Sequence, residues 1–501
     1  MTDIYPAAFA DSLPPVDPEF LSNVQAEAEY QVRRLNHHPS IAVWVGNNEL
    51  ELNIQLVQEI YPSEAAGFQS GYQTMFVDVL LHTVFDNTRS ISYSPSSVTH
   101  GYISFNISSS TPMVERYFNS TPGTITGNTD YYNYDPTQVF NNSAYPIGRF
   151  ATEFGYDSMP SFQSWEQVLP PDQRYFNSSV ILSRNHNYVQ TAATVLNPDK
   201  NQTQESLSGM GTIAITAQAF YPVPPTNTKS LKDFASWIYT TQVFQADYYK
   251  NQISFYRIGS GLPQRTLGSL YWVLNEMWQT PSKAGLEYDG RWKMVHYIVK
   301  NTYEPVIIAP QFDQSTGCLE VWTVSDLWNA VTGTATITWY DWAGKVLITS
   351  TSDVHIRAIN ATIAFELNVH DKGLDLSNAI AKLSVKAQEA APSSSNTSKI
   401  TIYTHETWFH AEPLSKHTIP NPKLSINYNG ASNSFVVRAS GGVAAWVWLD
   451  HPAGVSGNFD NNGFWLLPEQ AEIVKFKVKN DTTGGSWINS VTVRSLWDNT
   501  Q

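Results

Sequence analysis

Two glutamates that each follow a short apolar run are the residues of this sequence best suited to do chemistry. Glu49 ends the segment Trp44-Val45-Gly46-Asn47-Asn48-Glu49, and Glu153 stands near the end of Phe150-Ala151-Thr152-Glu153-Phe154. A pair of carboxyl groups can divide the work of hydrolysing a glycosidic bond, one protonating the leaving oxygen and the other attacking the anomeric carbon. The spacing therefore makes a glycosidase site the first hypothesis.

Each glutamate also has an ordinary structural explanation. Glu49 fits a charge in the first turn of a helix predicted from Leu50 to Ile60, where the helix dipole favours an acid. Glu153 fits a structural ion pair with a residue such as Arg149. Only the presence of both glutamates at the ends of buried strands favours the catalytic reading.

The elements that must position these residues alternate between helices and strands. Apolar residues recur at helical spacing in three segments, and short continuous apolar runs, typical of strands buried on both faces, follow them. The predicted helices are 17–36, 75–85 and 231–256, and the predicted strands are 41–45, 90–93, 150–154 and 269–274. Polar stretches at 108–142 and 185–210 stand where an α/β barrel carries its functional loops.

Beyond residue 303 the pattern changes to alternating strands such as Thr334 to Tyr340, broken by turns such as Trp342-Ala343-Gly344-Lys345. Residues 418–422 are predicted to link two β-sandwiches, and 391–398 to form a loop. The predicted domains are residues 1–302, which are catalytic, and the sandwiches 303–418 and 419–501.

Composition narrows the classes of partner. Of the 501 residues, 42% are hydrophobic, 13% aromatic and only 15% charged, with a net charge of -14. The negative charge argues against nucleic acid and anionic membranes, and apolar runs are too short to span a membrane. Aromatic rings among neutral polar side chains suit sugars, although a secreted β-rich protein with aromatic cores is an equal explanation.

Motifs for other chemistries are missing. The sequence has no His-Glu-x-x-His, no Gly-x-Ser-x-Gly and no phosphate-binding glycine loop. It also has no cysteine pair, since Cys318 is its single cysteine. His37 and His38 are better explained as a helix end than as metal ligands. We therefore expect neither metal nor cofactor.

Asn-x-Ser/Thr sequons favour a secreted glycoprotein. The eight sites are Asn106, Asn119, Asn141, Asn177, Asn201, Asn360, Asn396 and Asn480. The N-terminus beginning at Met1 lacks the basic and apolar regions of a signal peptide. Either the protein is cytosolic or its beginning is missing, and we expect the second.

The order of three motifs resembles glycoside hydrolase family 2 and, within it, the β-mannosidases. These are the helix and strand leading to Asn47-Asn48-Glu49, then Thr152-Glu153-Phe154-Gly155-Tyr156, then Leu270 to Gln279. The resemblance runs from about Pro18 to Trp292, and Asn458 to Pro468 is similar to the family's last domain.

The resemblance implies roles for particular residues. Glu49 would be the acid/base, Glu153 the nucleophile, and Asn48 a partner of the sugar 2-hydroxyl. Trp278 matches a tryptophan that stacks on substrate and Trp272 lies on the same segment. Core packing is the alternative for both tryptophans, and the stronger one for Trp272.

Further substrate contacts are left open. Tyr131, Tyr132 and Tyr134 precede the nucleophile where the family often has aromatic subsite residues, and the sequence does not choose among them.

The implied reaction removes terminal β-mannose, from oligosaccharides, mannan fragments or N-glycan cores, by double displacement with retention. Retention requires carboxyl groups about 5 to 5.5 Å apart. A nearby negative charge is expected to raise the pKa of Glu49. A β-galactosidase or exo-β-glucosaminidase of the same family, and a noncatalytic secreted carbohydrate-binding fragment, are the alternatives.

The position of Glu49 departs from the family pattern. The acid/base of the family ends the fourth barrel strand, yet here its strand begins at Ile41. The resemblance therefore implies an incomplete (β/α)8 TIM barrel followed by two immunoglobulin-like β-sandwich domains. Because an open barrel exposes strand edges and apolar core, we expect this chain alone to be unstable or inactive. A homodimer is one candidate assembly.

Overall fold

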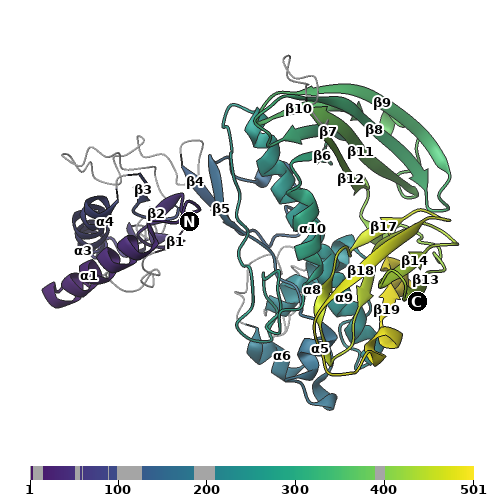
Figure 1. The fold of residues 1–501 in the computed structure, drawn as a ribbon, viewed down its shortest axis with the longest axis horizontal. Coiled ribbons are helices and arrows are strands. Elements are labelled where there is room, and N and C mark those ends of the chain that lie inside the picture. The colour runs from purple at the N-terminus through teal and green to yellow at the C-terminus, as the bar shows by residue number, and fades with distance from the viewer. Residues whose placement is uncertain are drawn as a thin grey trace. The chain divides into compact units, whose positions relative to one another are not determined.

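A computed structural model of the chain divides into two compact units (Figure 1). It describes residues 2–3, 15–50, 57–58, 60–88, 90–98, 127–185, 209–389 and 401–501. The first unit comprises residues 1–131, 146–154 and 262–270, and the second comprises residues 132–145, 155–261 and 271–501. Glu49 and Glu153 therefore lie in the same unit.

The helices of the first unit pack around α1 (Pro18–Leu35), which begins where the sequence predicts. Asp17 caps it by accepting a hydrogen bond from the backbone N–H of Phe20 at 2.8 Å. Its apolar stripe is buried against the other helices. These are α3 (Ala65–Tyr72), a π-helix (Gln73–Val79) and α4 (Leu80–Asn87).

The strands of the first unit are short and parallel. β2 (Val43–Val45) lies between β1 (Thr2–Asp3) and β3 (Ser92–Ser94) in one sheet. β4 (Asn128–Tyr131) pairs with β5 (Phe150–Phe154) in another. Parallel strands present their carboxyl ends at the same edge of a sheet, which is where ligands of such sheets commonly bind.

One predicted strand is largely wrong. Residues 269–274 form no regular strand, although Ser269 makes an isolated parallel bridge to Ala151 of β5. The Leu270 N–H donates to the Ala151 carbonyl at 2.8 Å, and the Ala151 N–H to the Gly268 carbonyl at 3.0 Å. Strand pairing is thus limited to the start of the apolar run.

Helices of the second unit include one that is buried nearly all round. α9 (Leu231–Ile258) begins at Ser230, whose hydroxyl accepts from the Asp233 N–H. Its buried positions cover every face, as expected for a helix enclosed by protein. The other α-helices that the structure describes in this unit are α5 (Phe162–Glu166), α6 (Ser179–Arg184), α8 (Gly209–Phe220) and α10 (Met294–Thr302).

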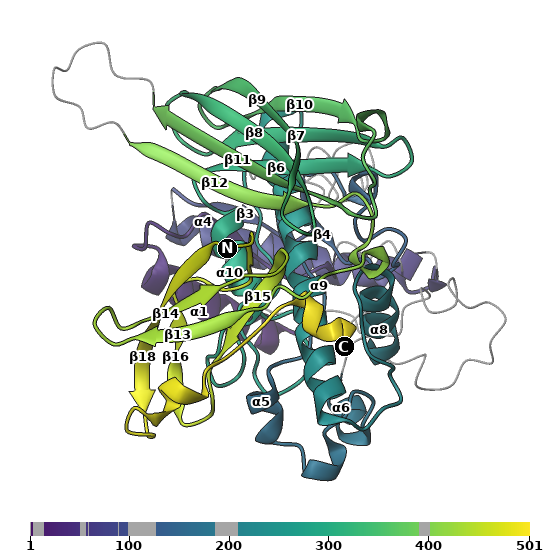
Figure 2. The ribbon, with the colours of Figure 1, turned by 90° about the vertical axis from the view of Figure 1, so that its right-hand side faces the viewer.

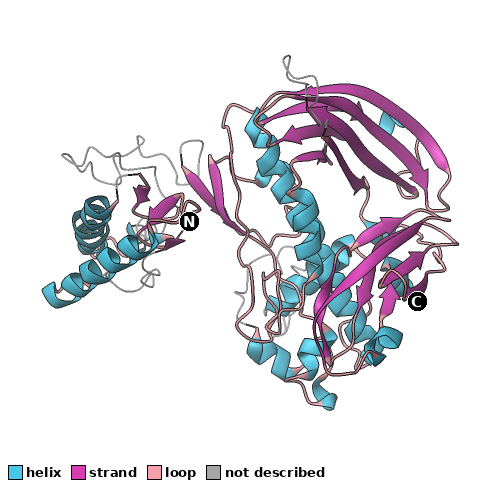
Figure 3. Ribbon diagram, viewed as in Figure 1, coloured by secondary structure: helices cyan, strands magenta, loops and turns pink. Residues whose placement is uncertain are grey.

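The first β-sandwich of the second unit packs two antiparallel sheets, one with the order β10-β7-β6 and the other β12-β11-β8-β9 (Figures 1 and 3). Its core takes side chains from both sheets, among them Val321, Ile337 and Leu383. The strands are β6 (Val306–Asp313), β7 (Cys318–Ser325), β8 (Val331–Asp341), β9 (Val346–Ile356), β10 (Asn360–Asn368), β11 (Ala379–Glu389) and β12 (Ile402–Phe409).

The second β-sandwich has the sheet orders β13-β14-β18-β16 and β17-β15-β19, with its strands labelled across Figures 1 and 2. Val437, Val447 and Val474 belong to its core. The strands are β13 (Ser425–Asn429), β14 (Ser434–Arg438), β15 (Ala444–Asp450), β16 (Val455–Phe459), β17 (Phe464–Leu466), β18 (Ala471–Asp481) and β19 (Thr492–Arg494). The predicted change to all-β structure after residue 303 is confirmed, whereas the domain boundaries stay a prediction.

The sequons differ in how their asparagines are placed. Asn141 and Asn480 are exposed, and Asn177 and Asn360 are half-buried. Asn106, Asn119, Asn201 and Asn396 lie outside the described residues, as do the predicted loop 391–398 and most of the polar stretches 108–142 and 185–210. Within the described ranges, no helix combines the length and apolar character needed to cross a membrane.

Candidate active site

Glu49 is held in a turn that follows β2. The buried Asn47 fastens this turn, since its Nδ2 donates to the Pro95 carbonyl at 2.6 Å. Its Oδ1 accepts from the Ser96 hydroxyl at 2.8 Å. The Glu49 backbone N–H donates to the Ser97 carbonyl, and its φ of 55° lies in the left-handed region that side chains rarely adopt. Such strain persists only where the surroundings enforce it, and it is concentrated at functional sites.

Gly46 lets the β2 turn approach the chain after β3. A Cβ at this position would lie 2.3 Å from the Tyr93 hydroxyl oxygen and 2.7 Å from the Pro95 carbonyl oxygen. Any side chain would therefore push these two segments apart. The glycine of the Trp-Val-Gly-Asn-Asn-Glu segment is thus required by a close backbone approach.

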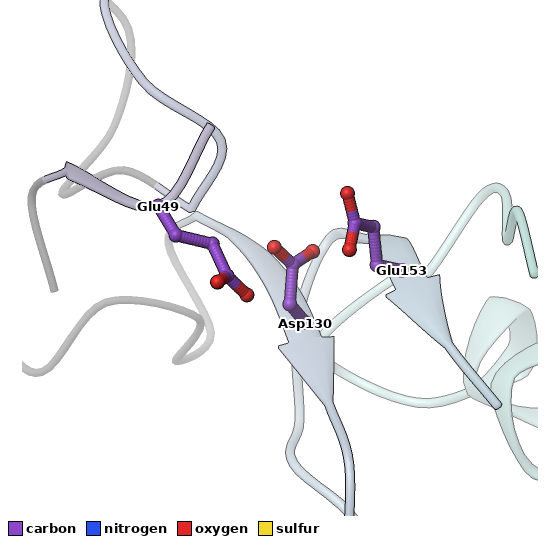
Figure 4. Close-up of side chains that lie close together, drawn as sticks. All are labelled: Glu49, Asp130 and Glu153. Atoms are coloured by element: carbon purple, nitrogen blue, oxygen red, sulfur yellow. The ribbon is translucent and has the colours of Figure 1, made fainter. Parts of the chain in front are cut away.

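Glu153 faces a third carboxylate, Asp130, across two parallel strands. Asp130 on β4 and Glu153 on β5 are register partners, beside a bulge in the ladder. Glu49, Asp130 and Glu153 each bring a carboxylate oxygen within 4.8 Å of the others. Figure 4 shows Asp130 between the two glutamates. The structure thus brings together the two predicted glutamates and adds an aspartate that the sequence did not single out.

The cluster is electrostatically strained because three acids share a small, partly enclosed volume. Burial raises the pKa of Glu49, and a hydrogen bond with Asp130 partly offsets the rise. Burial also raises the pKa of Asp130 well above its usual range, and the charge of Glu153 raises it further. The predicted direction for Glu49 is confirmed, but its first cause is burial and not a neighbouring charge.

The same three oxygens are close enough to bind one cation. Carboxylates can lie close together without an ion, however, and the cluster alone assigns no metal. The three carboxyl groups relieve their mutual repulsion equally well by retaining protons, as the raised pKa values of Glu49 and Asp130 indicate. We therefore treat the cluster as a set of acids that share protons.

The other predicted site residues fall into both units. Asn48 is half-buried, and its backbone makes a parallel bridge to Ser97 in the first unit. Trp272 and Trp278 belong to the second unit. Trp272 is 48% exposed, which contradicts the core-packing alternative, and its predicted contact with substrate stays a prediction. Trp278 is half-buried, and the Arg184 guanidinium lies over its ring at 4.2 Å.

The tyrosines before the nucleophile are also divided. Tyr131 ends β4 in the first unit, whereas Tyr132 and Tyr134 belong to the second. The Lys283 ammonium lies 5.3 Å from the Tyr132 ring centre and 5.4 Å from that of Tyr134. Both rings therefore make cation–π contacts with the same lysine.

Sequence reasoning missed Asp130 and Asn47. Asn47 stands inside the Asn-Asn-Glu segment, but a buried role cannot be distinguished from a substrate contact by composition. Asp130 lies in a polar segment with no strand pattern, Asn128-Thr129-Asp130-Tyr131. Its proximity to Glu153 depends on the pairing of β4 with β5, for which a period-2 pattern gives no signal.

Two family models match the C-terminal part of the chain. One is described as a mannosidase Ig/CBM-like domain and matches residues 317–419. The other, described as an Ig-fold domain, matches residues 419–499. Together with the two observed sandwiches, these matches make the chain multidomain with Ig-like domains.

Curated relatives match nearly the whole chain. Beta-mannosidase A of Aspergillus terreus is 44% identical over 98% of this chain and 53% of its own length. Beta-mannosidase A of Neosartorya fischeri is 43% identical over 98% of this chain and 52% of its own length. The chain spans about half the length of the curated relatives it matches.

Solved structures give the same picture of the fold. The β-D-mannosidase of Dictyoglomus thermophilum matches with a TM-score of 0.68 at 19% identity, covering 96% of this chain and 51% of that one. An exo-chitosanase of Amycolatopsis orientalis matches with a TM-score of 0.58 at 14% identity, covering 96% and 55%. At these identities the likeness concerns the fold alone. With the curated relatives, it confirms the resemblance predicted from the sequence.

Proposed function

Because the chain is a homologue of the β-mannosidases of glycoside hydrolase family 2, we propose that it carries the catalytic carboxyls of a retaining exo-β-mannosidase. The substrate is a β-mannoside, from which the enzyme removes the terminal non-reducing mannose. The observation that carries this proposal is that a carboxylate oxygen of Glu49, in the turn after β2, lies within 4.8 Å of one of Glu153, near the end of β5 in the same unit.

The separation of the carboxyl oxygens favours retention. Inverting glycosidases keep their carboxyl groups about 6.5 to 9.5 Å apart to admit a water molecule, whereas retaining enzymes keep them about 5 to 5.5 Å apart. One oxygen of Glu49 and one of Glu153 lie within 4.8 Å of each other, which supports the shorter, retaining separation. Glu153 is therefore the nucleophile that forms the glycosyl intermediate, in line with its place in the Thr-Glu-Phe-Gly motif.

Glu49 is the acid/base of the proposed reaction. Its pKa is raised by burial, so it retains a proton that it can give to the leaving oxygen. In the second step the ionised Glu49 accepts a proton from the attacking water. Asn48, next in the chain, is the proposed partner of the 2-hydroxyl of the sugar.

The two tryptophans are proposed substrate contacts of different kinds. Trp272 is half exposed and offers an indole face to a sugar ring. One face of Trp278 is already covered by the Arg184 guanidinium, so a sugar can stack only on the other face. A sugar would therefore reach the Trp278 ring from one side only.

The finer architecture is part of the proposal. The parallel strands β1 to β5 are proposed to be strands of an incomplete (β/α)8 barrel within residues 1–302, with Ig-like sandwiches at 303–418 and 419–501. Secretion is proposed on the sequons, of which Asn141 and Asn480 are exposed for glycan attachment. A homodimer remains a proposal from sequence.

Hydrolysis of p-nitrophenyl β-D-mannoside tests the activity. It is measured for this 501-residue chain, for a version extended upstream through its own coding region, and for Glu153→Ala in the extended version. Activity in the wild type and its loss in Glu153→Ala are expected. Parallel assays with the β-galactoside and β-glucosaminide separate the related specificities. A folded wild-type protein that hydrolyses none of the three would contradict the proposal and favour a noncatalytic carbohydrate-binding protein.

A further inference from the structure

Asp130 is held by a chain of hydrogen bonds that does not involve the predicted catalytic residues. The Thr152 hydroxyl donates to Asp130 Oδ1 at 2.5 Å. The Asn128 side-chain amide donates to the Thr152 hydroxyl oxygen at 2.9 Å and to the Ser97 hydroxyl oxygen at 3.0 Å. Because Asn128 supplies a proton to Thr152, the hydroxyl proton of Thr152 is left to point at an acceptor such as Asp130.

The second oxygen of Asp130 is buried in the cluster. None of the described residues donates a hydrogen bond to Oδ2. A buried carboxylate oxygen without a donor is costly, whereas a protonated carboxyl group can itself donate to a neighbouring acid. Among the described residues, the titratable side chains beside Asp130 are Glu49 and Glu153, each with an oxygen within 4.8 Å of one of the Asp130 carboxylate oxygens.

Burial and the surrounding charges favour a proton on Asp130. Burial and then the charge of Glu153 raise the pKa of Asp130 well above its usual range, and the charge of Glu49 raises it further, whereas the hydrogen bond from Thr152 lowers it. Thr152 donates to Oδ1 and none of the described residues donates to Oδ2, so a proton on Oδ2 leaves Asp130 able to donate to a neighbouring carboxylate. The side chains of Asp130 and Glu49 are hydrogen-bonded, which makes Glu49 the acceptor of that proton.

We propose that Asp130 is a positioning residue that stays protonated and donates a hydrogen bond to the carboxylate of Glu49. This inference rests on the proposed function, because it concerns the state of Glu49 after it has protonated the leaving group. At that moment the proton of Glu49 moves to the glycosidic oxygen, and the charge left on Glu49 is stabilised by the Asp130 O–H. The proton of Asp130 itself is not transferred, and it keeps Asp130 from adding a third negative charge.

Two substitutions of Asp130 test whether it acts as a hydrogen-bond donor: asparagine keeps a donor at this position and alanine removes it. Asparagine has nearly the shape of aspartic acid and carries N–H donors, so Asp130→Asn should retain most of the activity. Asp130→Ala removes the donor, and kcat/KM for p-nitrophenyl β-D-mannoside should fall roughly ten- to a hundredfold. The alkaline limb of its pH profile should move upward, because Glu49 loses the bond that stabilises its ionised form.

The leaving group provides a readout that mere damage to the fold would not give. With 2,4-dinitrophenyl β-D-mannoside, whose departure needs no acid, the first step should be nearly insensitive to Asp130→Ala. Asp86→Asn, an exposed change on α4 in the same unit, is the matched control and should match the wild type. If Asp130→Asn is as impaired as Asp130→Ala, the residue works as a carboxylate and the proposal is wrong; if neither is impaired, it has no such role.

A titration that does not require turnover keeps this inference apart from the proposed function. The side-chain carboxyl of Glu49 can be followed by ¹³C NMR and assigned through Glu49→Gln. The expected midpoint is higher in Asp130→Ala than in the wild type and nearly unchanged in Asp130→Asn. Equal midpoints in all three proteins would overturn the proposal about Asp130, whereas an inactive wild type with the expected midpoints would overturn only the proposed function.

Discussion

Asp130 on β4 is the register partner of Glu153 on β5, so two acids leave neighbouring parallel strands at the same level. Glu49 adds a third from the turn after β2, with oxygens of all three within 4.8 Å. Such a cluster cannot carry three full charges cheaply in a partly buried place. The cluster therefore favours the protonated forms of Glu49 and Asp130, whose pKa values are raised.

The first prediction concerns Glu49 as the general acid and base. Glu49→Gln should lower kcat/KM for p-nitrophenyl β-D-mannoside by about 10²- to 10⁴-fold, because amides do not transfer protons. With the 2,4-dinitrophenyl substrate the intermediate should form but hydrolyse slowly, and added azide, which needs no base, should restore turnover. Glu64→Gln, an exposed change before α3, is the control. Full activity of Glu49→Gln on both substrates would remove Glu49 from the mechanism.

The second prediction concerns the close approach at Gly46. Gly46→Ala should destabilise the protein by about 1–3 kcal/mol, because the new methyl group overlaps the Tyr93 hydroxyl and the Pro95 carbonyl. Denaturant unfolding measures the loss. Adding Tyr93→Phe should recover only part of it, since the backbone of Pro95 still obstructs the methyl group. An unfolding free energy equal to that of the wild type would show that the turn adapts.

The third prediction concerns two neutral histidines, one in the first β-sandwich and one in the segment that follows it. The Ile308 N–H donates to His405 Nδ1 at 3.2 Å, and the Trp342 indole N–H donates to His417 Nδ1 at 2.9 Å. Burial lowers the pKa of each histidine to about 4. Protonating either Nδ1 would place two donors face to face.

The sign of this pH dependence follows from the lowered pKa. Because the folded protein binds the histidine proton less readily than the unfolded chain does, the stabilisation from each neutral histidine is complete above pH about 6.5. This stabilisation is lost as the pH falls towards about 4. Each histidine should therefore lower the free energy of unfolding by about 3 kcal/mol as the pH falls from about 6.5 to about 4. Thermal unfolding of His405→Asn between pH 7.5 and 4 should show a shallower loss, with the exposed His355→Asn as control. A slope unchanged from that of the wild type would contradict the prediction.

The fourth prediction concerns a buried ion pair in the second unit. Lys293 Nζ lies 2.7 Å from Glu276 Oε1, and both side chains are almost fully buried. Lys293→Met should cost about 3–5 kcal/mol because it leaves Glu276 buried without its cation. Adding Glu276→Met should recover much of that loss, and the double-mutant cycle measures the coupling. Simple additivity of the two single changes would show that the pair is not coupled.

Local signals in the sequence were sufficient for several elements. The capping aspartate and apolar spacing predicted α1, and the apolar run Phe150–Phe154 predicted β5. The segment 269–274 failed because a short apolar run does not reveal whether its whole length finds a partner strand. Only its beginning pairs with Ala151.

The sequence by itself determined the identities and chain order of Glu49 and Glu153, the helix that precedes the strand of Glu49, and the all-β half that follows. These depend on interactions between residues close in the chain. Only the tertiary structure decided that Asp130 joins the two glutamates and that burial is the main cause of the raised pKa values of Glu49 and Asp130. Both facts arise from strand pairing between distant segments and from the desolvation that this pairing imposes, and neither leaves a local pattern.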